Sequence, residues 1–310
     1  MDEAGSEDYC TRIVHDLGEV GAEAWNALLR GAPAPSPFVR FEFLQALHDT
    51  GCASARTGWD PHYLTLWRRD RLCAAVPLYR KHHSYGEYVF DWAWAEAQQR
   101  HGIAYYPKWL AAVPFTPVPG PRLLAIDATA RARIARELFN LFFESSLSSF
   151  HVLFPTEIEA ACLAQAGALT RQSVQFHWFN RGYRSFDDYL ANLAQPKRKK
   201  VRAERRKVEA AGVSVRRCLG PAITEEDWAL FDECYRNTYA AHHSSPYLNR
   251  QFFQRLAQTM PENLLLVIAA RAGRDIAAAL ALIDNERVYG RYWGTLEAIP
   301  CLHFEVSYYQ

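Results

Sequence analysis

Several features are missing from this sequence of 310 residues, and each absence excludes a class of protein. No apolar run approaches the roughly 20 residues that a membrane-spanning helix needs. The first ten residues, MDEAGSEDYC, are acidic and polar, unlike a signal or transit peptide. Repeats and low-complexity tracts are absent as well. The sequence therefore predicts an ordinary globular protein of the cytoplasm.

Cysteine is scarce and scattered. The chain has seven cysteines and no C-x-x-C pair. An odd number without paired spacing argues against both a disulfide framework and a zinc site. The histidine pairs at 82–83 and 242–243 are adjacent in sequence, so their side chains point in different directions on a helix or a strand. We expect no bound metal.

What is present is a globular composition with many aromatic residues. The chain is 49% hydrophobic, 22% charged and 14% aromatic, and its formal charge is +1. At roughly 150 residues per domain, the length allows two domains. In the first half, the patterns predict strands at 63–67, 72–79 and 151–154, helices at 128–143 and 156–165, and an extended aromatic stretch at 85–94.

The second half repeats this kind of pattern. Residues 174–179 alternate as a strand, and a helix beginning at Ser185 is followed by a basic helix that ends near Ala211. Further helices start near Thr224 and Asn249, and three strands follow as a meander at 264–271, 276–283 and 288–293. The last nine residues, LHFEVSYYQ, are typical of the first turns of an amphipathic helix without a stop signal. We expect a C-terminal domain that is incomplete, as in a fragment.

The basic helix concentrates the positive charge. Eight of the eleven residues from 197 to 207 are Lys or Arg, opposed by Glu204 alone. Three interpretations remain open. The helix face is simply solvated; it is a nucleic-acid patch, although no sequence-reading DNA-binding motif accompanies it; or it binds the phosphates of an acyl donor beside a transfer site. On the third interpretation, the donor-phosphate residues are Lys197, Arg198, Lys199 and Arg202.

Residues 197–215, KRKKVRAERRKVEAAGVSV, resemble the lysine- and arginine-rich helix of the Fem-type transferases. The match is closer to the FemAB-like, or peptidoglycan biosynthesis/recognition, family of the GNAT acyltransferase superfamily. From about residue 12 to the end, its passages appear nearly in order: SPFVRFEFLQAL, TGWDPHYL, VPLYRKHHSYGEYVFDWAWA, YYPKWLAAVPFTPVPGPRLL, HVLFPTE, QFHWFNRGYRSFDDYL, RYWG and HFEV.

The resemblance implies an α/β (α+β) protein of two GNAT-like units, each a mixed, mostly antiparallel sheet flanked by helices. We expect a disordered N-terminus at 1–11, an N-terminal domain at 12–172 and an incomplete C-terminal domain at 173–310. The implied function is the transfer of an acyl or aminoacyl group from acyl-CoA or aminoacyl-tRNA to an amine, on a peptidoglycan-related acceptor. No Q/R-x-x-G-x-G/A loop is present, which argues against a standard acetyl-CoA site.

Such a transfer needs a base for the attacking amine and an acid for the leaving group. Glu305 is the first candidate base, since burial among its apolar neighbours would raise its pKa; the alternative is a salt bridge to Arg291. His303 is a second candidate. Tyr308, three residues after Glu305, is predicted to share its helical face and act as the acid. Arg291 and Tyr292 are expected in the same cleft.

Two acids stand out in the aromatic run YGEYVFDWAW. Glu87 and Asp91 have an even spacing, so on a strand they would share one face. We expect them to bind a cationic or hydroxyl-rich acceptor, with Trp92 or Trp94 stacking on a sugar; the alternative is an exposed strand face. Other functions also remain open: a CoA-dependent N-acyltransferase acting on an unrelated amine, or a non-catalytic protein that binds cell-wall precursors or nucleic acid.

Overall fold

The computed structural model describes residues 9–30, 32, 36–89 and 91–310. The chain divides into two compact units, Met1–Arg171 (unit 1) and Gln172–Gln310 (unit 2). The expected disorder at 1–11 is wrong for the last three of these residues, since strand β1 (Tyr9–Val14) includes them; the rest lie outside the described residues. Within the described part of the chain, no helix combines the length and apolarity needed to cross a membrane.

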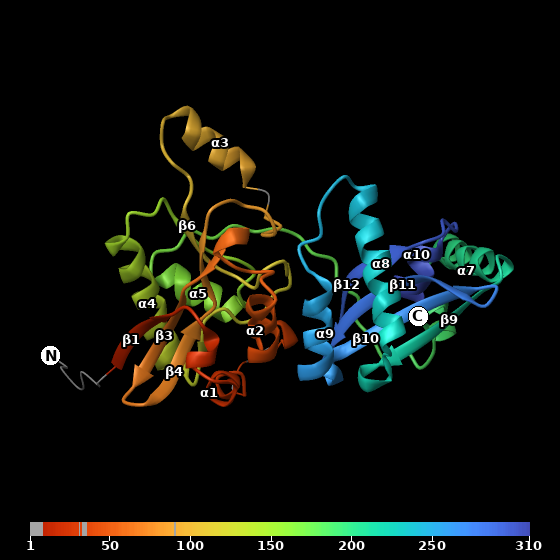
Figure 1. The fold of residues 1–310 in the computed structure, drawn as a ribbon, viewed down its shortest axis with the longest axis horizontal. Helices are drawn as coiled ribbons and strands as arrows, with labels where there is room; N and C mark the ends of the chain where they lie inside the picture. The colour runs from red at the N-terminus through yellow and green to blue at the C-terminus, as the bar shows by residue number, and fades with distance from the viewer. Residues whose placement is uncertain (1–8, 31, 33–35, 90) are drawn as a thin grey trace. The chain divides into compact units, whose positions relative to one another are not determined.

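Unit 1 contains two sheets (Figure 1). The first has the antiparallel order β1-β3-β4-β7, from β1, β3 (Tyr63–Arg68), β4 (Arg71–Val76) and β7 (Leu124–Ala125). The second has the order β2-β5-β6-β8, from β2 (Trp59–Pro61), β5 (Leu78–Lys81), β6 (Lys108–Ala111) and β8 (Phe150–Val152), with β6 and β8 parallel. The single strand expected at 72–79 is divided at Pro77, which has no N–H for a ladder, and its two halves belong to different sheets.

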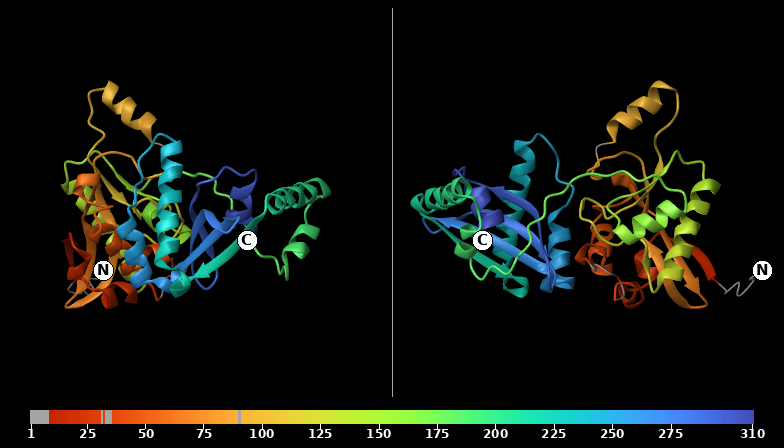
Figure 2. Two further views of the ribbon diagram at one scale, coloured as in Figure 1. Left: turned by 45° about the vertical axis from the view of Figure 1, so that its right-hand side comes forward. Right: turned by 180° about the vertical axis from the view of Figure 1, so that it is seen from behind.

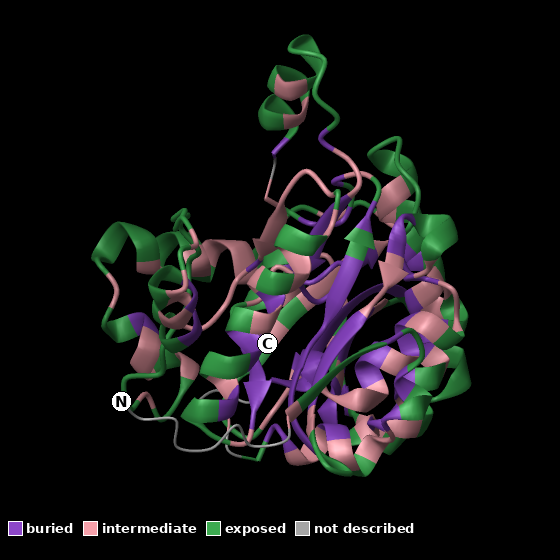
Figure 3. Cartoon of the chain, turned by 90° about the vertical axis from the view of Figure 1, so that its left-hand side faces the viewer, coloured by how far each residue is buried: buried purple, intermediate pink, exposed green. Residues whose placement is uncertain are grey.

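Unit 1 has five α-helices within the described residues. They are α1 (Ala22–Ala27), α2 (Phe41–Asp49), α3 (Trp92–Arg100), α4 (Ala128–Glu144) and α5 (Glu157–Gln165). All except α3 cover its sheets (Figure 1). The side chain of Asp127 caps α4, and a capping box between Thr156 and Glu159 starts α5. Ile134 and Leu138 of α4 pack with Leu64, Leu66 and other strand residues into one buried core. Figure 3 shows these buried strands in purple beside helices whose outer turns are exposed.

Unit 2 contains one antiparallel sheet in the order β12-β11-β10-β9. Its strands are β9 (Val213–Leu219), β10 (Leu264–Arg271), β11 (Arg274–Ile283) and β12 (Val288–Thr295), which confirms the predicted meander. Its helices are α6 (Phe186–Ala191), α7 (Gln195–Ala210), α8 (Glu225–Ala241), α9 (Arg250–Thr259) and α10 (Leu302–Phe304), with a π-helical turn at Glu305–Tyr309. The predicted class, mixed mostly antiparallel sheets flanked by helices, is confirmed.

The two faces of this sheet are covered by different helices (Figure 2). Tyr292 contacts Tyr235 of α8 and Phe253 of α9. On the other face, Val208 of α7 and Leu302 and Val306 of the C-terminal helical turns pack with Val267 and its neighbours on the strands. The basic helix and the C-terminal residues therefore lie on one face, and the aromatic helices α8 and α9 lie on the other.

Two predicted strands do not form. In the 85–94 stretch, residues 85–89 form turns and loop, and α3 starts at Trp92. The alternation at 174–179 has no strand partner among the described residues and is loop. In the first stretch, buried charges hold the backbone in place of a ladder, as described below.

Candidate functional site

Unit 1 contains a buried group of charges around Lys108, the first residue of β6. Its ammonium Nζ lies 2.9 Å from Glu87 Oε2 and 2.6 Å from Asp91 Oδ2, and all three side chains are at most 1% exposed. The same ammonium donates to Ser84 Oγ at 3.3 Å. We call these four residues, together with Tyr105, the Lys108 cluster. Two carboxylates on one buried ammonium make a charge network that must stay paired to remain stable.

Hydrogen bonds and burial shift the pKa values of the two carboxyl groups in the cluster in opposite directions. Tyr105 donates its hydroxyl to Asp91 Oδ2 at 2.6 Å. Burial alone would raise the pKa of Asp91, but the hydrogen bonds from Lys108, Ser84 and Tyr105 lower it to about 2. For Glu87, burial outweighs the attraction of Lys108, and its pKa is raised. Glu87 Oε1 and Asp91 Oδ1 are buried and accept no hydrogen bond from any described residue.

A second buried lysine borders this cluster. Lys81, at the end of β5, is fully buried, with its ammonium 4.3 Å from the centre of the Trp59 ring. It lies 3.2 Å from His83 Nδ1 and donates to the carbonyl of Tyr85 at 3.3 Å. Burial, which disfavours its charged form, lowers the pKa of Lys81 to about 7.

The structure places the predicted acceptor residues differently from the strand we expected. Glu87 and Asp91 do come together, but both are buried and occupied by Lys108, so they hold the chain rather than offer a free carboxylate. The aromatic residues beside them are exposed: Tyr85 and Trp94 by 57% and Trp92 by 43%. The rings of Tyr85 and Trp92 lie 5.0 Å apart, edge to face. We call these three exposed residues the aromatic surface of unit 1; Tyr85 and Trp92 are in contact, whereas Trp94, two positions along α3, points in another direction and has the guanidinium of Arg171 5.7 Å from its ring centre.

Helix α3, which contributes two of these rings, has no buried residue and stands away from the sheets of unit 1 (Figures 1 and 3). The Lys108 cluster holds its N-terminal end, because Asp91 is the residue immediately before the helix. Sequence reasoning missed Lys81 and Lys108. A signal existed, since these are the only lysines before residue 197 and they flank the aromatic run.

In unit 2, α7 carries the eight predicted cations, and three of them have carboxylate partners. Arg205 pairs with Glu305, Arg202 with Asp187 at 3.3 Å, and Lys200 with Glu204 at 3.8 Å. The other five form no ion pair with any described residue; they are Lys197, Arg198, Lys199, Arg206 and Lys207. Three of the four predicted phosphate-binding residues are therefore available to a ligand.

A groove of about 500 Å³ runs beside α7. Its cationic side is formed by Arg202, Arg205 and Arg206, and its apolar floor by Leu190, Val208, Val213 and Val215, with Phe186 at its edge. The guanidinium of Arg205 lies 4.7 Å from the centre of the Phe186 ring. We call this the arginine groove.

Glu305 is buried at the end of the arginine groove, but it is not free. Arg205 donates to both of its oxygens, with Nε at 3.2 and 3.1 Å and Nη2 at 2.9 Å from Oε1. Gln310 donates to Oε1 as well, at 2.6 Å. The alternative of a salt bridge is found, but its partner is Arg205 and not Arg291. A carboxylate engaged in this two-pronged, charge-assisted pair is held in its ionised form and in a fixed orientation, which disfavours a role as general base.

His303 and Tyr308 lie together, away from Glu305. Tyr308 is 68% exposed while Glu305 is 5% exposed, so they do not share a face; the backbone there is a π-helical turn, in which residues three apart diverge. The ring of His303 lies 5.7 Å from that of Tyr308, edge to face, and 5.0 Å from that of Trp293. Partial burial lowers the pKa of His303, so its imidazole is neutral at pH 7 and can accept a proton.

Arg291 and Tyr292 do not join these residues. Tyr292 faces α8 and α9, on the sheet face opposite α7 and the C-terminal turns, and the guanidinium of Arg291 lies 5.1 Å from the Tyr292 ring centre. Arg291 is the extra residue of a β-bulge, because Leu280 pairs with Tyr292 and Ala281 with Gly290. The expectation that these two residues line one cleft with Glu305 is wrong for Tyr292.

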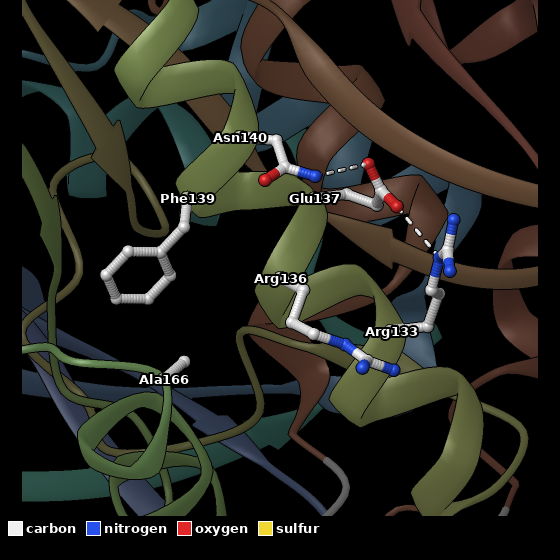
Figure 4. A pocket seen from close by; sticks show the side chains of 6 residues that line it. All are labelled: Arg133, Arg136, Glu137, Phe139, Asn140 and Ala166. Carbon is white, nitrogen blue, oxygen red and sulfur yellow. Dashed lines mark hydrogen bonds and ion pairs between the residues drawn. The ribbon is translucent and has the colours of Figure 1, made fainter. Parts of the chain in front are cut away.

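A further hollow, of about 360 Å³, lies on unit 1 between α4 and the end of α5 (Figure 4). In it, Arg133 pairs with Glu137 at 2.8 Å and Asn140 donates to the same carboxylate at 3.2 Å. The carboxylate of Glu137 is therefore engaged by Arg133 and Asn140. In the part of the chain that the structure describes, no group of three or more His, Cys, Asp or Glu side chains is placed to hold a metal.

Comparison with known proteins gives a family and a fold. A family model described as FemAB-like, peptidoglycan biosynthesis/recognition, matches residues 16–310. A crystal structure of a conserved protein of unknown function from Bacteroides thetaiotaomicron is similar at 12% identity and a TM-score of 0.52, over 97% of this chain and 85% of that one. No protein with a curated description matches the sequence.

A second solved structure is the C-terminal domain of a proposed lysylphosphatidylglycerol synthetase from Agrobacterium fabrum. It is 10% identical, with a TM-score of 0.48, over 92% of this chain and 71% of that one.

Proposed function

Because the chain belongs to the FemAB-like family of peptidoglycan biosynthesis/recognition, we propose that it is a transferase that passes an acyl or aminoacyl group to an amine of a peptidoglycan-related acceptor. The family match over nearly the whole chain supports a peptidoglycan-related transferase role. The donor class that we propose is acyl-CoA or aminoacyl-tRNA, and the cationic side chains of α7 support it.

The observation that carries the donor assignment is the unpaired charge of α7. Lys197, Arg198 and Lys199 form no ion pair with any described residue, whereas Lys200 and Arg202, further along the helix, do. Arg198 and Arg202 are four residues apart on α7, and like charges at that spacing repel by a few tenths of a kcal/mol per pair. A bound polyphosphate or nucleic-acid backbone would relieve that repulsion, and both donor classes carry one.

For the chemical step we propose His303 as the base and Tyr308 as the acid. The acceptor nitrogen attacks the donor carbonyl carbon, His303 takes the proton that the nitrogen loses, and the bond from that carbon to the leaving oxygen or sulfur breaks. Tyr308 donates a proton to the leaving atom. Glu305 is then a positioning residue: its ion pair holds the side chain of Arg205 in the wall of the arginine groove.

We propose that the aromatic surface of unit 1 binds the sugar of the acceptor. The exposed ring of Trp92, beside Tyr85, or that of Trp94, on another side of α3, suits the apolar face of a sugar ring. The Lys108 cluster would keep the rings in place by anchoring the chain on both sides of Tyr85. This assigns Glu87 and Asp91 a supporting role in acceptor binding.

A calorimetric titration tests the donor site. Acetyl-CoA and an aminoacyl-tRNA are titrated separately into the wild-type protein and into Lys197→Ala/Arg198→Ala/Lys199→Ala, with exposed Arg274→Ala of β11 as the control. We expect one donor to bind wild type and the control equally and the triple variant at least tenfold more weakly. Equal affinity for the triple variant would refute the assignment.

A second function, binding of a cell-wall precursor without transfer, is favoured by one observation. The carboxylate best placed for catalysis by sequence, Glu305, is fully engaged by Arg205. A pure binding protein would take muropeptides on unit 1 and would show no change in any binding property on replacement of His303.

A further inference from the structure

The arginine groove of unit 2 has the dimensions and the lining of a small-molecule site. Its volume of about 500 Å³ lies within the roughly 300–1,000 Å³ that such sites usually have. They are typically apolar, with a few polar groups that fix the orientation of the ligand. The groove combines an aliphatic floor with a cationic wall, and each of them specifies one part of a ligand.

The floor is aliphatic and incompletely covered. Val213 and Val215 are two residues apart on β9, so their side chains lie on the same face of the sheet. They pack against the core that contains Val208 of α7, but both remain only half-buried, whereas Val208 is 2% exposed. Leu190 of α6 completes the floor. An alkyl chain lying on this floor would remove the remaining valine surface from water, which is favourable.

The wall carries positive charge that the protein neutralises only in part. Arg205 is fixed in the wall by the contacts described above. Arg206, the next residue, is exposed and forms no ion pair with any described residue. Arg202 pairs with Asp187, whose side chain is 84% exposed, and an ion pair so open to water contributes little. Two guanidinium groups, those of Arg202 and Arg206, are therefore available to an anion.

The acidic residues of the groove do not reverse this preference. Three carboxylates line it, those of Asp187, Glu209 and Glu305. Glu305 is engaged by Arg205, and the other two are exposed to solvent. Over the whole of α7, eight Lys and Arg residues stand against two Glu residues, a net charge of +6. The electrostatic field of the helix therefore favours an anion in the groove.

The lining also selects among anions. Apart from charged residues, it consists of aliphatic side chains, Phe186 and one neutral polar side chain, that of Gln310, which already donates to Glu305. A sugar or a peptide would place hydroxyl or amide groups against the floor without hydrogen-bond partners, which is costly. An alkyl chain has no such groups. A carboxylate suits the wall, because Arg202 and Arg205 both bind carboxylates of the chain itself.

We propose that the arginine groove binds a fatty acid, with the alkyl chain on the aliphatic floor and the carboxylate held by Arg202 and Arg206. An anionic head and an aliphatic chain are the two parts that the wall and the floor specify. Lys197, Arg198 and Lys199, which carry the donor assignment, do not line the groove, so this inference goes beyond the proposed function and does not depend on it.

Calorimetric titration of the full chain with hexanoate, octanoate and decanoate, each below its micelle concentration, tests the proposal. Burial of each added methylene group should tighten binding about fourfold. Decanoate should therefore bind at least tenfold more tightly than octanoate. Decanol, which has the same chain and no carboxylate, should bind at least tenfold more weakly than decanoate.

Variants separate the wall from the floor. Arg202→Gln/Arg206→Gln, at two exposed positions, should weaken decanoate binding at least tenfold. Val215→Phe fills part of the groove and should weaken decanoate binding more than hexanoate binding. Exposed Arg274→Gln of β11 is the control and should bind decanoate as wild type does. The donor-site variant Lys197→Ala/Arg198→Ala/Lys199→Ala should bind decanoate within threefold of wild type, which distinguishes this site from the donor site.

Three results would overturn the proposal: no binding of decanoate, binding that does not strengthen with chain length, or binding that Arg202→Gln/Arg206→Gln leaves unchanged. A groove occupied by residues of this chain or of a second copy would give the first of them. Decyl phosphate that binds at least tenfold more tightly than decanoate would assign the groove to a lipid phosphate and would overturn the carboxylate.

Discussion

Replacing Lys108 by methionine tests whether the Lys108 cluster holds unit 1 together. The substitution keeps most of the side-chain volume and removes the charge. It leaves two carboxylates, now 2.9 and 2.6 Å from Nζ and at most 1% exposed, without their cation. Breaking a buried ion pair by removing one partner typically costs about 3–5 kcal/mol, and here both acids lose the same partner. We expect the free energy of unfolding to fall by about 4 kcal/mol at pH 7.

The pH dependence separates this explanation from a simple packing defect. Without Lys108, burial raises the pKa values of both acids above their unfolded values, so the folded variant binds protons more readily than the unfolded chain. The stability of Lys108→Met should therefore rise as pH is lowered from 7 toward 5. Wild type should gain less, because only the pKa of Glu87 is raised there, whereas the pKa of Asp91 lies at about 2.

The assay is urea unfolding followed by tryptophan fluorescence at pH 7 and pH 5. Exposed Lys207→Met on α7 is the matched control and should change stability by less than about 0.5 kcal/mol. Adding Asp91→Asn to Lys108→Met should recover part of the loss, because one of the two stranded charges is removed. A loss below about 1 kcal/mol, or one that does not change with pH, would refute the reasoning.

Three further predictions follow from the geometry. The wild-type protein should lose about 2 kcal/mol of stability as pH falls from about 4 to about 2. The reason is that the pKa of Asp91 is lower in the folded chain than in the unfolded one, so the ionised carboxylate stabilises the fold and protonation removes that contribution. Asp91→Asn should lack this loss in the same acid titration. Gly294→Ala should destabilise unit 2 by about 3 kcal/mol in thermal unfolding, because the added Cβ would lie 1.9 Å from the carbonyl oxygen of Cys234. The control Gly290→Ala has open space around its Cβ and should cost little. Equal costs for the two variants would contradict the close packing of α8 on β12. Arg205→Ala should lower the free energy of unfolding by about 2 kcal/mol, because it removes the ion-pair partner of buried Glu305. Glu305→Gln should keep the rate of transfer within a few-fold of wild type. If Glu305→Gln abolished transfer without changing stability, Glu305 would be the base.

Local patterns in the sequence predicted the elements that local rules govern. The unit 2 meander, the capped helices at Ser185, Thr224 and Asn249, and the basic helix follow from alternation, capping residues and periodicity, and all of them form. The stretch at 85–94 failed because its two acids are held by Lys108, about twenty residues later in the chain. A long-range ion pair of this kind leaves no periodic signal.

The candidate site was predicted only in part, because long-range contacts also determine which of its residues lie together. The residue types were recognised, but their grouping depends on tertiary contacts. Glu305 pairs with Arg205, a hundred residues away, and the π-helical turn directs Tyr308 toward His303. Neither the partner nor the turn type can be obtained from spacing along an assumed α-helix.

The most direct test of the central claim is transfer itself. A peptidoglycan precursor peptide with a free amine is incubated with the protein and with acetyl-CoA or an aminoacyl-tRNA, and the acceptor is examined by mass spectrometry. We predict that one donor adds the mass of its acyl or aminoacyl group to that amine, and that His303→Ala slows the addition at least a hundredfold while donor affinity is retained. An unchanged acceptor with both donors, alongside measurable binding of the precursor, would contradict the transferase proposal and leave a binding protein.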